Sequence, residues 1–179
     1  DEAGSTSRLR LLDLRKNPGT AEKVDNVVEA AFRYYRRGDI SRELRHLQCR
    51  DGQVLVLEDA PSGSIIGCAT LFYHETSERE VVEVLLLAVE PKQRGRGASK
   101  RILAEIKRLG RREGWSHVFL HANDAVRHLY ESNGFEEANT ELTSGLSLLV
   151  SNDENDKDKR AKVEPENQRL TSLFCIDLR

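Results

Sequence analysis

The feature that most limits how this chain can fold is a run of six apolar residues, 84–89, the longest in the sequence. A helix that crosses a bilayer needs about 18 apolar residues, so this run is too short to span a membrane. An unbroken apolar run of this length is typical of a strand that is covered on both faces. A chain of 179 residues is long enough for one domain with a substantial core. We therefore expect a sheet with layers packed on both sides.

The order of the predicted elements indicates an α/β domain with a mixed central sheet of six to seven strands and helices on both faces. Helical patterns separate some of the strands, whereas short turns join others. Thr20 is the candidate N-cap of the first helix, and Gly114 is expected to end the third. Helices are expected at 21–35, 41–47, 97–114 and 125–132. Strands are expected at 9–14, 54–57, 65–73, 81–89, 118–120, 135–142 and 170–178. Residues 146–150 can form a further strand that pairs with the sheet.

The chain is expected to form a single domain over residues 7–179, preceded by a flexible tail at 1–6. A polar segment at 151–168, just before the last strand, holds six acidic and four basic residues and almost nothing apolar. Such a segment cannot bury enough surface to fold alone, so we expect an exposed or disordered insert.

Charge and cysteine content limit the kind of ligand and the cellular compartment that are expected for this protein. The formal net charge is −2, yet residues 81–135 contain ten Lys and Arg against six Asp and Glu. A basic centre in an acidic chain suits an anionic ligand at one site better than a nucleic acid spread over the surface. Three widely spaced cysteines and no leader segment are typical of an intracellular protein. His46 and Cys49 are two potential metal ligands, but no second pair accompanies them, so no metal is expected.

The most informative stretch follows the apolar run and reads Arg94-Gly95-Arg96-Gly97-Ala98-Ser99. Two glycines allow a tight turn and a close approach of the backbone to a ligand. The amides at the start of the following helix and the two arginines add positive charge. These features predict a diphosphate cradle, although an ordinary strand-to-helix turn with incidental arginines is the alternative. The stretch is neither a P-loop nor a dinucleotide-binding fingerprint.

Two segments together resemble the GNAT superfamily of acetyltransferases. The loop at 94–99 is similar to the family's acetyl-CoA loop, with Ser99 where Gly or Ala is usual, and it follows Ala88-Val89-Glu90-Pro91. The segment from Asn123 to Phe135 resembles a second family motif, Asn…Ala…Leu-Tyr…Gly-Phe. The resemblance implies a GNAT fold in which two parallel strands splay around acetyl-CoA.

The resemblance also implies which residues bind the donor. The pantetheine arm would pair with the backbone of Leu87, Ala88 and Val89, and the pyrophosphate would lie on the amides of Arg94, Gly95, Arg96, Gly97, Ala98 and Ser99. Asn123 is a candidate hydrogen-bond partner of the pantetheine. Its alternative role is an ordinary helix N-cap.

Acetyl transfer to an amine needs a base, because a lysine amine with a pKa of about 10.4 arrives protonated. Glu83 is the candidate base, and its strand resembles that of the Gcn-type histone acetyltransferases. The alternative is a glutamate that faces the surface, with Glu80 and His121 as substitute bases. Tyr130 is the candidate acid that protonates the CoA sulfur, and it is also a candidate acetyl-CoA-binding residue. Its alternative role is packing of an aromatic ring in the core.

The acceptor is expected to be a lysine of a basic protein or peptide, with a histone tail as the first candidate. One alternative is a small amine such as a polyamine, amino sugar or antibiotic in an enclosed pocket. Another is a binding module of this fold without turnover. No nucleic acid or membrane partner is expected. The nucleus is favoured over the cytoplasm.

Overall fold

The computed structural model describes residues 7–32, 53–75, 80–138 and 172–178. The predicted tail at 1–6, the helix at 41–47, the strand at 146–150 and the insert at 151–168 lie outside these residues. The strands are β1 (Ser7–Leu12), β2 (Gln53–Asp59), β3 (Ile65–Glu75), β4 (Glu80–Val89), β5 (His117–Ala122), β6 (Glu136–Glu137) and β7 (Ser172–Asp177). The helices are α1 (Pro18–Ala31), α3 (Ala98–Glu113) and α4 (Asp124–Glu131), with 3-10 turns η1 (Leu14–Lys16) and η2 (Pro91–Gln93).

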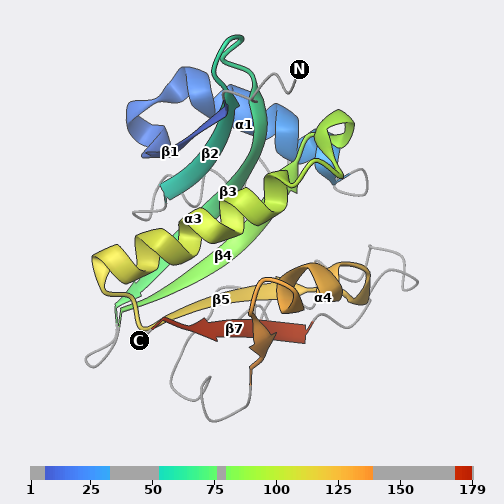
Figure 1. The fold of residues 1–179 in the computed structure, drawn as a ribbon. Helices are drawn as coiled ribbons and strands as arrows, with labels where there is room; N and C mark the ends of the chain where they lie inside the picture. Colours follow the sequence, from blue (N-terminus) through green and yellow to red (C-terminus); the bar gives the residue numbers. More distant parts are fainter. Residues whose placement is uncertain (1–6, 33–52, 76–79, 139–171, 179) are drawn as a thin grey trace, which may run out of the picture. The chain divides into compact units, whose positions relative to one another are not determined.

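The strands form a seven-stranded mixed sheet in the order β1-β2-β3-β4-β5-β7-β6, with one parallel pair. This arrangement confirms the predicted α/β class (Figure 1). The splay of the parallel strands around a ligand stays a prediction. The chain divides into two compact units, which are described separately: residues 1–73 with 84–109, and residues 74–83 with 110–179.

The first unit buries its core on both faces of β2 and β3. Val56 and Cys68 pack with Val24 and Val28 of α1 in one cluster. Side chains alternate along a strand, so Gly67 must face the other way, and its nearest neighbours include Ile102 of α3. The two helices therefore cover opposite faces of this part of the sheet, with α3 in front and α1 behind in Figure 1.

The second unit is built on the antiparallel pair β5 and β7, in register from His117 opposite Asp177 to Ala122 opposite Ser172. The pair β6–β7 is also antiparallel. Phe119 and Cys175 pack with Val81 of β4 in a separate apolar cluster. Cys175, like Cys68 in the first unit, is a buried free thiol, as its apolar strand predicted.

Several predicted boundaries differ from those in the structure. The strand β1 begins at Ser7 rather than residue 9, because its pairing with β2 extends from Ser7 to Leu12. The helix α1 begins at Pro18 rather than Ala21, and Asn17 rather than Thr20 occupies the N-cap position. Proline fits the first helical position since its missing N–H would have no partner there. Within the described residues, β6 covers Glu136–Glu137, and positions 139–142 of the predicted strand lie outside those residues.

Candidate functional site

The first unit carries the glycine-rich loop between β4 and α3. Gly95 and Gly97 have φ values of +75° and +78°, a left-handed conformation that glycine adopts without strain. The first intrahelical bond of α3 runs from the Arg101 amide to the Gly97 carbonyl at 3.1 Å. The amides one to three residues before Arg101 therefore have no acceptor within the helix and point toward its N-terminal end. This geometry fits the predicted anion cradle.

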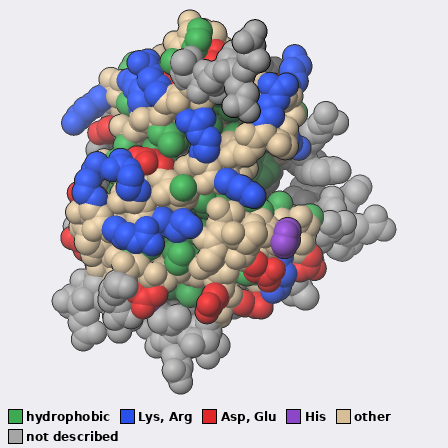
Figure 2. Space-filling view, in the orientation of Figure 1, with side chains coloured by type: hydrophobic (Ala, Val, Ile, Leu, Met, Phe, Trp, Pro, Cys, Tyr) green, Lys and Arg blue, Asp and Glu red, His purple; other side chains and the backbone are tan. Residues whose placement is uncertain are grey.

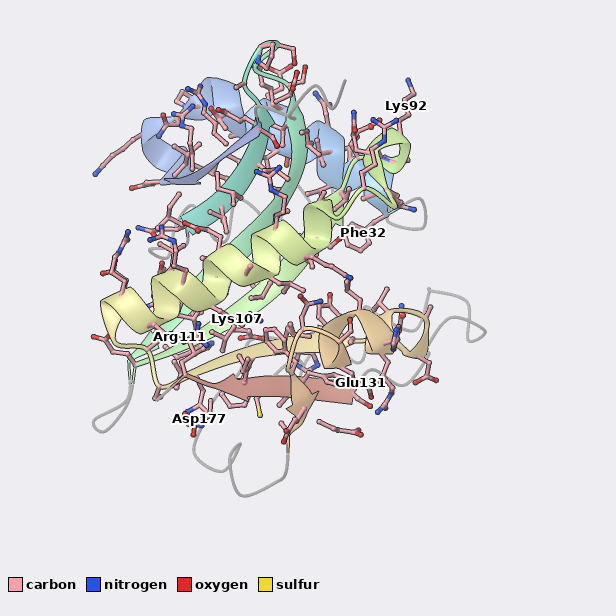
Figure 3. All side chains as sticks on the ribbon, viewed as in Figure 1. Phe32, Lys92, Lys107, Arg111, Glu131 and Asp177 are labelled. Carbon is pink, nitrogen blue, oxygen red and sulfur yellow. The ribbon has the colours of Figure 1, made fainter. Side chains whose placement is uncertain are left out.

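The two loop arginines are exposed and hold the loop together. Arg94 donates from Nη2 to the carbonyl of Ala31, the last residue of α1, at 3.0 Å. Arg96 donates to Oε1 of Gln93 at 3.3 Å. Lys92 projects outward from the same loop (Figure 3). Arg94 thus has a structural contact in addition to the phosphate contact that the sequence predicts.

The strand end before this loop is closely packed. Ala88 and Val89 are buried, and Leu87 is partly buried. A Cβ atom on Gly67 of β3 would lie 2.8 Å from the carbonyl oxygen of Ala88, so only glycine allows the two backbones to approach this closely. Gly67 was not among the residues predicted from the sequence, although an isolated glycine within a strand is a known signal of such an approach.

The second unit holds the candidate base. The Glu83 side chain is fully buried, so the alternative of a surface-facing glutamate is wrong. His74, near the end of β3, hydrogen-bonds through Nε2 to Oε2 of Glu83 at 2.9 Å. His74 is itself largely buried, with 11% of its side chain exposed. Glu80, a substitute base in the sequence analysis, is exposed at the start of β4.

His121 and Asn123, at the end of β5, have unsatisfied polar atoms. Three buried atoms have no hydrogen-bond partner among the described residues. They are the two ring nitrogens of His121 and Oδ1 of Asn123. Burial lowers the pKa of His121, and the charge of Glu83 partly opposes that shift. Asn123 occupies the N-cap position of α4 but makes no side-chain capping bond, so the N-cap alternative does not account for its amide.

Tyr130 lies inside the second unit on α4. Its ring packs against Phe135 and Phe174, with centroid distances of 6.1 Å and 6.3 Å. Burial raises the pKa of Tyr130 to about 12, so the phenol keeps its proton at neutral pH. The residue is both a packed aromatic and a group that is able to donate a proton.

Comparison with known proteins identifies the central part of the chain. Residues 50–137 match the model of the acetyltransferase (GNAT) domain. The protein carries a GNAT acetyltransferase domain. That stretch includes the glycine-rich loop, Glu83, His74, His121 and Tyr130. A search of curated proteins finds no match.

Solved structures show that the GNAT fold extends over nearly the whole chain. A GNAT-family acetyltransferase from Desulfovibrio desulfuricans is 17% identical, with a TM-score of 0.68 over 97% of this chain and 100% of its own. Tetrahymena Gcn5 is 12% identical, with a TM-score of 0.67 over 96% of both chains. The N-acetylglutamate synthase of Neisseria gonorrhoeae, complexed with coenzyme A and N-acetylglutamate, is 20% identical, with a TM-score of 0.63 over 96% of this chain and 35% of its own. The resemblance to the Gcn-type branch stays a prediction.

The GNAT domain also contains a residue that the sequence analysis missed. His74 lies near the end of β3, and no motif marks it, because its contact with Glu83 depends on the pairing of two strands. Within the described residues, no group of three or more His, Cys, Asp and Glu side chains is arranged to hold a metal ion. No helix in this part of the chain is long and apolar enough to span a membrane.

Proposed function

We propose that this acetyltransferase moves the acetyl group of acetyl-CoA directly onto the side-chain amine of a protein lysine. The observation that carries the proposal is the buried Glu83 hydrogen-bonded to His74, on the strand that leads into the glycine-rich loop. Burying a carboxyl group is costly unless it is hydrogen-bonded, so an acidic side chain kept in this buried position points to proton chemistry.

The residues of the first unit fit the donor. The helix-start amides and the left-handed turns at Gly95 and Gly97 offer hydrogen-bond donors to a diphosphate. Arg94 and Arg96 add positive charge beside them. The backbone of Leu87, Ala88 and Val89 would pair with the pantetheine arm, and the amide near Ala88 would donate to the thioester oxygen as it gains charge.

The residues of the second unit supply the proton chemistry. An acceptor lysine must pass one proton to a base of this unit, directly or through water, before its nitrogen can attack, and the Glu83 carboxylate favours this transfer. When the amine attacks, the C–N bond forms and the C–S bond breaks. Tyr130, which is protonated at neutral pH, then donates its proton to the departing thiolate. The phenol regains a proton from the acetylated nitrogen.

Charge favours a basic acceptor. The described part of the first unit contains 12 Lys and Arg against eight Asp and Glu, whereas that of the second contains three against nine. Figure 2 shows Lys and Arg side chains gathered over α3, and Asp and Glu gathered over α4. A positive unit suits the anionic donor, and a negative unit attracts a cationic peptide.

The test measures release of free CoA from acetyl-CoA with core histones, with polyamines and amino sugars, and without acceptor. We expect histone-dependent release that falls at least about 100-fold in Glu83→Gln. The exposed Glu113, at the end of α3, provides the control Glu113→Gln, which should match wild type. Release with small amines alone would assign a small-molecule acceptor instead. Acetyl-CoA binding without release under any condition would favour a binding module.

A further inference from the structure

Glu83 is buried too completely to meet an acceptor directly. None of its side chain is exposed, and Oε2 is engaged by His74 at 2.9 Å. A base must come within about 3 Å of the proton that it removes, directly or through one water. Glu83 is thus out of direct reach, and either a water or another side chain must carry the proton between it and the acceptor.

His121 is the side chain that meets this requirement. Both of its ring nitrogens are buried and lack a hydrogen-bond partner among the described residues. An imidazole with two unsatisfied nitrogens is costly to bury, which points to a ligand that supplies the missing partner. The residue as a whole keeps some exposure, unlike Glu83, although its two ring nitrogens are themselves buried, so the acceptor must enter the site to reach them.

The surroundings of His121 suit a group that gains positive charge. Glu83 on β4 acts on it electrostatically, and His74 on β3 holds that carboxylate in place. The residue opposite His121 on β7 is the apolar Leu173. An imidazolium formed at His121 would therefore be stabilised by Glu83.

We infer that His121 is the catalytic residue that touches the acceptor and accepts its proton, while Glu83 stabilises the imidazolium and His74 positions Glu83. This inference rests on the proposed function. One N–H bond of the acceptor ammonium breaks, its electron pair stays on the amine nitrogen, and the proton binds the bare nitrogen of neutral His121. The amine then attacks the thioester, and the imidazolium later releases its proton to solvent.

The pH dependence follows from this assignment. Burial is the largest influence and lowers the pKa of His121 from 6.5, whereas the charge of Glu83 raises it. Activity requires the neutral imidazole, so it should fall as the pH drops through this lowered pKa. Glu83→Gln removes the opposing charge and should move the acid limb of the kcat profile to lower pH, in addition to reducing kcat.

The deciding experiment compares wild type, His121→Gln, His121→Ala with added imidazole, and the exposed control His128→Gln. It measures kcat with the best acceptor among core histones, polyamines and amino sugars, together with the Kd for acetyl-CoA. We expect kcat of His121→Gln to fall at least about 100-fold with an unchanged Kd, imidazole to restore activity to His121→Ala, and His128→Gln to match wild type.

Two results would overturn the assignment of His121 alone. One is an active wild type with a kcat within about twofold of that of His121→Gln. The other is a loss of acetyl-CoA binding in His121→Gln as large as its loss of kcat, which would indicate a structural role. A wild type that transfers acetyl to none of these acceptors would overturn the proposed function, and this inference with it.

Discussion

At the scale of single residues, the pair of His74 and Glu83 has the largest consequences. A carboxylate that is 0% exposed needs a donor, and His74 provides one at 2.9 Å. Removing one partner of a buried hydrogen bond leaves the other group unsatisfied, which typically costs about 1–3 kcal/mol. The pair therefore links the stability of the second unit to the chemistry of Glu83.

His74→Leu and His74→Gln separate these two effects. Leucine cannot donate a hydrogen bond, so we expect a lower free energy of unfolding and a large loss of kcat with little change in the KM for acetyl-CoA. Glutamine donates from its amide and should recover most of both losses. Thermal unfolding and steady-state kinetics on both variants provide the measurement. Wild-type kcat in His74→Leu would show that His74 does not position Glu83.

Tyr130 offers a second test at this scale, because phenylalanine keeps its ring contacts with Phe135 and Phe174. We expect Tyr130→Phe to preserve the unfolding midpoint but to reduce kcat about tenfold to 100-fold, since the proton donor is lost. With a pKa of about 12, Tyr130 should cause no alkaline loss of activity near neutral pH. An unchanged kcat would leave Tyr130 with a packing role only.

The sequence indicated part of the site and not the rest. Glu83, Tyr130 and the loop at 94–99 lie in linear motifs, so a resemblance could point to them. The partner of Glu83 could not be found in this way, because His74 meets it only through strand pairing. His121 was a substitute base without a reason to prefer it, since its unsatisfied nitrogens become visible only in three dimensions.

At the scale of the element, two glycines near the end of α3 have different roles, Gly110 within the last turn and Gly114 just after it. Gly114 has a φ of +82°, and the Trp115 amide bonds back to the Gly110 carbonyl at 2.9 Å, the pattern of a Schellman motif. A Cβ atom on Gly110 would lie 2.9 Å from Cε3 of Trp115 and would overlap Leu178. The helix keeps Gly110 because Leu178 and the buried Trp115 fill the space where a side chain would be.

Gly110→Ala should therefore destabilise the protein even though alanine is the better helix former. Overpacking of this kind costs about 1–3 kcal/mol and outweighs the helix-propensity gain of about 1 kcal/mol. Gly19→Ala in α1 is the matched control, since its Cβ would meet nothing within 4 Å, and it should be neutral or stabilising. Urea unfolding of both variants checks the pair. Equal stabilisation by the two substitutions would contradict this role of Trp115.

Element boundaries were less predictable than element types. The long periodic segments β4 and α3 were predicted to within a few residues, because burial leaves a clear pattern in them. The start of α1 was missed because Pro18 at its first position outweighed the apparent cap at Thr20. For β1, pairing with β2 decided the ends rather than the apolar run itself.

At the scale of the whole molecule, the predicted α/β class was right because strand and helix order constrain the fold strongly. The separation of charge is a property that element order does not reveal. Lys and Arg exceed Asp and Glu by four in the described first unit, and Asp and Glu exceed Lys and Arg by six in the second. Fields of this kind raise the local concentration of ligands of opposite charge.

The separation predicts a salt effect on both substrates. Raising NaCl from about 50 mM to about 500 mM shortens the Debye length to a few ångströms and should raise the KM for acetyl-CoA and for a basic peptide severalfold. Because the chemistry is buried, kcat should change little. KM values that do not respond to salt would show that the charges of the two units do not steer the substrates.

The most direct test of the account is identification of the products. Wild-type protein is incubated with acetyl-CoA and core histones, and mass spectrometry of the histones is combined with quantification of free CoA. We expect acetylated lysine and free CoA in equal amounts, with both greatly reduced in Glu83→Gln. Release of CoA without acetylated amine, or equal transfer by Glu83→Gln, would contradict it.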